Sequence, residues 1–201
     1  MNMKKTFLAT ICLFTGMTMY SQQIDIQPVP QKMTPATQTI QLTGNYQLNG
    51  MNEANPYASK ALKTLLGTGE SVKGGIKVYI GEKGDKAVSK YKKFIPAQAE
   101  GYFVRISPKE IVLAGYDERG TYYAVQTFRQ LMEDGQLPVT DITDWPDIRF
   151  RGVVEGFYGT PWSHEARLRH LKFYGENKMN TYIYGPKDDP YHSSPNWRLP
   201  Y

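Results

Sequence analysis

The stretch that decides the fold is Arg151-Gly-Val-Val-Glu-Gly-Phe-Tyr-Gly-Thr-Pro-Trp162, a short apolar run that ends abruptly in glycine, proline and aromatic residues. A second stretch, Tyr182-Ile-Tyr-Gly-Pro-Lys-Asp-Asp-Pro190, repeats this pattern. Buried parallel strands that open into functional loops have such sequences. The residues between the two stretches have a helical pattern. The segment therefore predicts two parallel strands joined by a helix in a right-handed crossover.

These strand ends predict the place of a site. In α/β folds, the chemistry gathers beyond the carboxyl ends of parallel strands. We therefore expect a site at Gly156–Pro161 and Gly185–Pro190. A (β/α)8 barrel takes roughly 250 residues, and the segment from Asp147 to Tyr201 has room for only two of its eight units. We expect the chain to be an N-terminal piece of a larger protein, with the barrel truncated after its second unit.

Residues 1–21 have the pattern of a signal peptide. Lys4 and Lys5 precede an apolar run from Thr6 to Tyr20, and Ser21 is small enough for a cleavage site. This run is shorter than the about 20 residues that a membrane-spanning helix needs, although a short membrane anchor is an alternative. We expect a mature chain that begins near residue 22, is secreted or periplasmic, and has no stable membrane insertion after signal cleavage.

The composition excludes few functions. The single cysteine, Cys12, lies in the signal peptide, so the mature chain is expected to have no disulfide and no thiolate chemistry. Its stability must then come from core packing. The net charge of +5 includes Lys4 and Lys5 of the signal peptide, and charges of both signs are mixed along the chain. Such a weakly basic surface does not specify a partner.

Residues 22–146 have the pattern of an α+β or α/β domain in which helices cover a sheet. Two helices with one apolar face each are predicted at 56–66 and 121–132, the first capped by Asn55 and ended by Gly67. A basic, exposed helix is predicted at 85–94. The predicted strands are 39–42, 46–48, 76–80, 102–106 and 111–114. The last two are expected to form a hairpin. Trp145-Pro146 marks the boundary with the barrel segment, residues 147–201.

The barrel segment is predicted to contain a strand at 150–155, a helix capped by Ser163, and a second strand at 180–184. Within the helix, Leu168, Leu171 and Tyr174 recur every three residues.

Two motifs outside the strand ends have simple structural explanations. His164 and His170 resemble part of a zinc-protease helix, but in that motif the second histidine follows the first by four residues, where this chain has Leu168. No metal site is expected. Gly81-Glu-Lys-Gly84 beside several lysines could clamp a nucleic-acid backbone. For an exported protein, a solvated basic helix is the favoured interpretation, and no nucleic-acid partner is expected.

Lys187 and Gly156 are the candidates for binding a ligand. A cation at the carboxyl end of a strand can donate hydrogen bonds to hydroxyl or carbonyl oxygens. Gly156 and Gly159 have no side chains, so a ligand can approach the backbone, where the Gly156 carbonyl is an available acceptor. Aromatic rings and hydroxyls around them suit a sugar, although several are also expected to serve in packing. These aromatic residues are Tyr158, Trp162, Tyr184 and Tyr191.

Asp188 and Asp189 are adjacent acids at the end of the second strand, and they resemble a general acid–base pair. Adjacent residues of an extended segment point to opposite sides, so one active site would not readily use both. The structural alternative is a loop that caps a turn before Pro190.

The chain resembles glycoside hydrolase family 84, the O-GlcNAcases and related β-N-acetylglucosaminidases, and in particular its secreted bacterial members. Val153-Val-Glu-Gly-Phe-Tyr-Gly159 with Pro161-Trp162 is similar to the family's strand-one signature, and Tyr184-Gly-Pro-Lys-Asp-Asp189 to its strand-two signature. The segments Gly115–Leu131 and Ile142–Gly152 resemble the α/β domain that precedes the barrel in families 20 and 84. The resemblance covers nearly the whole mature chain.

The resemblance implies a glycosidase that removes terminal β-linked N-acetylglucosamine from a glycan or glycoprotein and needs no cofactor. In this family the acetamido oxygen of the substrate attacks the anomeric carbon, which is the substrate-assisted exception to catalysis by a carboxylate nucleophile. Two consecutive aspartates after strand four assist the reaction. This pair lies beyond the chain, so we expect no catalytic residue here and no activity of the chain alone.

The resemblance also implies roles for the candidate residues. Gly156 would offer its backbone to sugar hydroxyls, Lys187 would bind a sugar hydroxyl, and Tyr158 would shape the pocket near the acetamide. Asp188 and Asp189 match the strand-two motif rather than the strand-four pair, so their expected place is behind the ligand contacts. A non-catalytic carbohydrate-binding or adaptor module is the alternative function.

Overall fold

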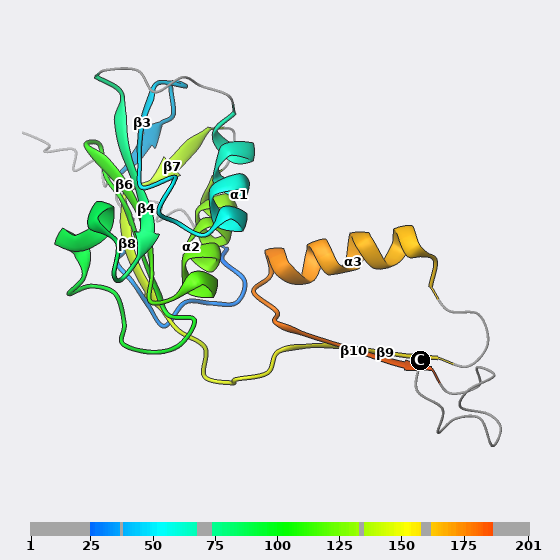
Figure 1. Cartoon of the computed structure of the whole chain (residues 1–201). Coiled ribbons are helices and arrows are strands. Elements are labelled where there is room, and N and C mark those ends of the chain that lie inside the picture. The colour runs from blue at the N-terminus through cyan, green and yellow to red at the C-terminus, as the bar shows by residue number, and fades with distance from the viewer. Residues whose placement is uncertain (1–24, 37, 68–73, 133–134, 158–161, 187–201) are drawn as a thin grey trace, which may run out of the picture.

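The computed structural model of the chain describes residues 25–36, 38–67, 74–132, 135–157 and 162–186 (Figure 1). These residues form a mixed α/β structure. A six-stranded sheet with its helices makes up the larger part, and a pair of strands with one helix extends from it. Within the described residues, no helix is long and apolar enough to cross a membrane.

The six-stranded sheet is mixed and has the order β1-β8-β5-β6-β4-β3. Its antiparallel side consists of β1 (Lys32–Met33), β8 (Thr140–Asp144), β5 (Tyr102–Ile106) and β6 (Glu110–Gly115). Its parallel side continues from β6 to β4 (Ile76–Glu82) and β3 (Tyr46–Asn49). A separate antiparallel pair joins β2 (Thr39–Gln41) to β7 (Gln136–Pro138). The predicted hairpin is confirmed as β5 and β6.

Apolar residues fill both faces of this sheet. One face packs against α1 (Pro56–Leu66) and α2 (Glu118–Leu131), where Leu62 and Phe128 are fully buried among strand residues (Figure 1). The other face packs against the 3-10 helix η1 (Lys86–Tyr91), whose Val88 and Tyr91 are buried beside Phe103. Because successive strand residues point to opposite faces, one sheet supplies both cores.

The helix ends follow their local signals. The Asn55 side chain accepts a hydrogen bond from the Tyr57 amide at 2.7 Å, and Gly67 ends α1 with a φ of +73°, as predicted. The second helix begins at Glu118 rather than at the predicted Thr121, because the Asp117 carboxylate accepts from the Gly120 amide at 2.8 Å.

The helix predicted at 85–94 is wrong in type and length. Only Lys86–Tyr91 is helical, and it is a 3-10 helix. Val88, Tyr91 and Phe94 recur every three residues and face the second core. That spacing matches the three residues per turn of a 3-10 helix better than the 3.6 of an α-helix.

The extending part consists of β9 (Gly152–Phe157), α3 (His164–Glu176) and β10 (Thr181–Pro186). The two strands pair in parallel, with Gly152 opposite Thr181 and Gly156 opposite Gly185, so the predicted parallel pairing is confirmed. Ser163 caps α3 by accepting from the Ala166 amide at 3.2 Å, as predicted. The strand predicted at 150–155 begins and ends two residues later. Figure 1 shows α3 running alongside the strand pair.

Candidate functional site

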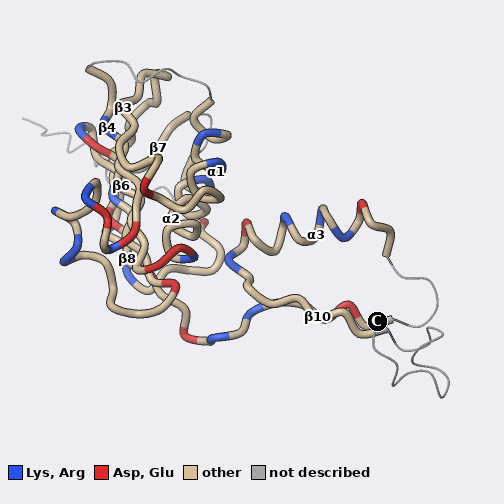
Figure 2. Tube along the Cα trace, viewed as in Figure 1, with Lys and Arg blue, Asp and Glu red and all other residues tan. Residues whose placement is uncertain are grey.

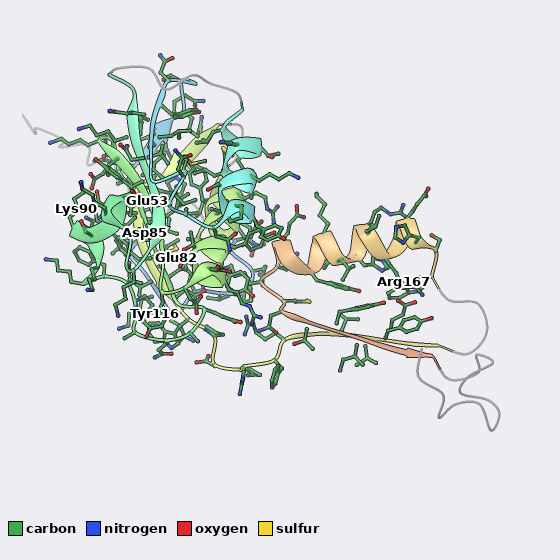
Figure 3. The ribbon with its side chains drawn as sticks, in the orientation of Figure 1. Glu53, Glu82, Asp85, Lys90, Tyr116 and Arg167 are labelled. Atoms are coloured by element: carbon green, nitrogen blue, oxygen red, sulfur yellow. The ribbon has the colours of Figure 1, made fainter. Side chains whose placement is uncertain are left out.

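The carboxyl end of β9 is held by a buried carboxylate. Glu155 is only 2% exposed, and both of its oxygens accept from the Arg167 guanidinium of α3 at 2.8 Å. The Tyr182 hydroxyl of β10 and the Trp162 amide donate to the same carboxylate. These hydrogen bonds, with the one from Arg167 strongest, lower the pKa of Glu155 to about 2 against the effect of burial. Figure 3 shows Arg167 between α3 and the strand pair.

Gly156 follows Glu155 directly and is exposed. Its partner in the parallel register is Gly185, so two glycines lie side by side one residue before the two strands end. Neither glycine has a side chain to cover the backbone, which leaves this edge open to a ligand. The segments that continue from these ends begin with Tyr158 and Lys187, and both residues lie outside the described residues.

A network of charged residues joins the amino end of the β9–β10 pair to the six-stranded sheet. The Glu100 carboxylate accepts from Arg151 at 2.5 Å, from Asn180 at 2.9 Å and from Arg119 at 3.0 Å. Burial alone would raise the pKa of Glu100, but these donors hold it below its ordinary value. The Arg151 guanidinium also donates to the Lys178 carbonyl at 3.1 Å. Figure 2 shows acidic and basic residues along the connection between the two parts.

The Tyr102 hydroxyl is the centre of a second, fully buried group at this junction. It donates to Asp144 at 2.6 Å and accepts from the Lys178 ammonium at 2.9 Å, which leaves its second lone pair for the Thr127 hydroxyl at 2.7 Å. Burial lowers the pKa of Lys178 to about 8, partly offset by Asp144. Lys178 and Glu100 are also the two residues other than glycine with left-handed backbones among the described residues, with φ of +60° and +63°.

Lys178 gives the stability a specific pH dependence. Its pKa of about 8 in the fold lies below the ordinary 10.5, so between these values the unfolded chain binds more protons and rising pH favours folding. We expect the unfolding free energy of the wild-type chain, relative to Lys178→Met, to rise by about 2 kcal/mol between pH 7 and pH 9.5. Urea unfolding at both pH values measures this difference. The exposed Lys172→Met is the control and should show no such change, and a constant difference for Lys178→Met would contradict the prediction.

A cavity at the junction of the two parts does not coincide with the predicted site. It has a volume of about 770 Å³ and lies at the junction, where Phe150, Asn180 and Thr181 line it together with Glu100 and Arg119. These residues are at the amino ends of β9 and β10, whereas Gly156 is near the carboxyl end. This cavity is therefore at the opposite end of the strand pair from the site that the sequence predicts.

Comparison with protein families identifies both parts of the chain. The model of glycosyl hydrolase family 20, domain 2, matches residues 23–145, which is more than half of the chain. The model of the beta-N-acetylglucosaminidase family matches residues 151–201. The chain belongs to this domain family and to the hexosaminidases of the family-84 type.

Solved structures and curated proteins agree with this family-84 type. The structure of CpGH84B is 36% identical, with a TM-score of 0.76, and CpGH84D is 26% identical, with a TM-score of 0.74. Both comparisons cover 89% of this chain but only 32% and 33% of those chains. The protein O-GlcNAcases of Rattus norvegicus and Mus musculus are 51% identical over 41 residues, which is 20% of this chain and 4% of theirs. The chain thus spans a minor part of each relative.

Of the residues predicted to bind the ligand or to lie beside it, the structure describes Gly156, Trp162 and Tyr184. Gly156 lies on β9 in register with β10, whereas Tyr158, Lys187, Asp188 and Asp189 lie outside the described residues. His170 packs against Trp162, with the two ring centroids 4.4 Å apart.

Glu155 and its partners are functional candidates that were not predicted from the sequence. An acidic residue between valines and a glycine in a buried strand was the available signal, because such a carboxylate needs a cation or several donors nearby. Arg167 in the following helix is a cation within reach of it.

Proposed function

We propose that the full-length protein is a glycoside hydrolase that removes terminal β-linked N-acetylglucosamine, including the O-GlcNAc type, by substrate-assisted retaining catalysis. The parallel register of β9 and β10 carries this proposal, because it brings Gly156 and Gly185 side by side immediately before the segments that begin with Tyr158 and Lys187. The family-84 type of the chain supplies the reaction. Cleavage after residue 21 and a secreted or periplasmic location are part of the proposal.

The binding roles follow from the chemistry of each residue. The Gly156 backbone accepts hydrogen bonds from sugar hydroxyls, and the Lys187 ammonium donates to a sugar hydroxyl. Tyr158 shapes the pocket near the acetamide group. Asp188 and Asp189 would contact the residues that bind the sugar rather than the sugar itself, and they are not the acid pair of the reaction.

The catalytic acids come from elsewhere in the full-length protein. We propose that residues 22–146 are a domain of the hexosaminidase type and that residues 147–201 form the first two units of a (β/α)8 barrel. A later strand of that barrel would carry the two aspartates, one to polarise the acetamide and one to act as general acid and base. Because the chain spans about a third of the solved relatives, an assay must compare the 201-residue chain with the full-length protein. Turnover of an aryl N-acetylglucosaminide by the chain alone would refute the placement of the acids.

Lys187→Ala in the full-length protein tests the proposed sugar contact. Loss of a hydrogen bond from a charged donor costs about 1.5 kcal/mol or more, so kcat/KM should fall at least about tenfold, mainly through KM. Steady-state kinetics on the aryl substrate measure this, with the exposed Lys172→Ala as the control. Unchanged KM and kcat would remove Lys187 from the site.

A further inference from the structure

The contact between α3 and the strand pair is polar where α/β structures usually have an apolar layer. None of the residues of α3 is buried, and Leu168 and Leu171 are 54% and 43% exposed. The two strands present Glu155 and Tyr182 toward the helix, whereas Val154 and Ile183 on the opposite face are 60% and 52% exposed. Within the described residues, Arg167 of α3 contacts both Glu155 of β9 and Tyr184 of β10.

The Glu155 carboxylate is fully engaged in this contact. The Nε and Nη2 atoms of Arg167 each donate to one carboxylate oxygen of Glu155. This bidentate pairing fixes the plane of the guanidinium relative to the plane of the carboxylate. The same guanidinium lies 4.9 Å from the Tyr184 ring. A buried ion pair is a weak source of net stability but a strong source of defined geometry, because any shift leaves a charge without its partner.

This geometry acts on the binding edge directly. Glu155 precedes Gly156 in β9, its Tyr182 contact fixes the neighbouring strand, and its Trp162 contact fixes the first described residue after the β9 loop. Three segments that surround the Gly156 backbone are thus tied to one carboxylate. We propose that Glu155 is a positioning residue that holds the Gly156 carbonyl in the orientation that binds the sugar. This inference rests on the proposed function of the strand ends.

The variant Glu155→Gln in the full-length protein tests the inference. An amide keeps the shape of the side chain, but its NH2 group meets the donors of Arg167, so the fork is broken. Gly156 would contact the bound sugar before and during the reaction alike, so the loss should appear in binding. We expect KM for an aryl N-acetylglucosaminide to rise about tenfold, with kcat changed less than about threefold.

Two further variants separate positioning from general damage. Tyr182→Phe removes a single donor to Glu155 and should raise KM by a smaller factor, about threefold. Glu165→Gln removes the same charge from the exposed first turn of α3 and should leave both constants unchanged. If Glu155→Gln does not fold, the KM of Tyr182→Phe decides: an increase supports the inference, and no change overturns it.

Hydrogen exchange distinguishes this inference from the proposed function. In Glu155→Gln, the amides of residues 152–157 should exchange at least about tenfold faster, while those of the six-stranded sheet should not change. A folded variant with unchanged KM or unchanged exchange at 152–157 would overturn the positioning role. A wild-type full-length protein without hexosaminidase activity would refute the proposed function, and exchange at Gly156 would then decide alone whether Glu155 holds the strand end.

Discussion

Glu100→Ala is expected to lower the free energy of unfolding of the chain by about 4 kcal/mol, because removing one partner of a buried ion pair leaves the other charge uncompensated. The side chain of Glu100 is 9% exposed and that of Arg151 is 19% exposed, so water cannot fully replace the lost carboxylate. The Asn180 amide would lose one of its two acceptors as well and keep the Arg149 carbonyl. Urea unfolding followed by circular dichroism measures the loss.

Glu118→Ala is the matched control for this substitution. Glu118 is exposed in the first turn of α2 and lines the same cavity as Glu100. Among the described residues, it accepts no hydrogen bond from a buried donor. It contributes only through the helix dipole, about 0.5 kcal/mol. Equal losses for the two variants would mean that the Glu100 network is not a buried ion pair in solution.

Gly152→Ala is expected to open the amino end of the β9–β10 pair. A Cβ atom at Gly152 would lie 1.6 Å from the carbonyl oxygen of Thr181, and Thr181 is the register partner of Gly152. Both groups belong to the backbone, so no rotamer change relieves the clash. A cost of about 3 kcal/mol should make the amides of residues 152–157 and 181–186 exchange about a hundredfold faster.

Gly84→Ala is the control for added bulk at a glycine. A Cβ atom there would meet nothing within 4 Å, and the backbone of Gly84 is not left-handed. Exchange in the β9–β10 pair should match the wild type in this variant. If Gly152→Ala also matched the wild type, the strand register would be wrong.

The parts of the fold that the sequence predicted are those with local signals. Asn55, Gly67 and Ser163 each cap a helix through their own backbone or side chain, so the pattern within a few residues is sufficient. The parallel pairing of β9 and β10 followed from two apolar runs separated by a helix. Local signals also explain the wrong assignment of segment 85–94, because a three-residue repeat and an α-helical repeat differ little over so short a stretch.

The junction could not be predicted because its residues are far apart in the sequence. Glu100 lies 51 residues from Arg151 and 80 from Asn180, and Lys178 lies 76 residues from Tyr102. Charged residues in such positions show no periodicity. The left-handed backbone conformations at Glu100 and Lys178 could not be predicted either, because neither residue is a glycine.

The hydrogen-bond partners at the junction lie on both sides of the predicted boundary after Pro146, so a cut there would separate them. One half would keep Glu100 and the Tyr102 hydroxyl. The other would keep Arg151 and Asn180, which donate to Glu100, and Lys178, which donates to Tyr102. The Glu176 carbonyl in the last turn of α3 would also lose two donors, because Arg129 and Gln130 lie on the other side of the cut. A piece that ends there would leave the Glu100 carboxylate without two of its three donors, so we expect the two parts of the intact chain to unfold in one cooperative transition.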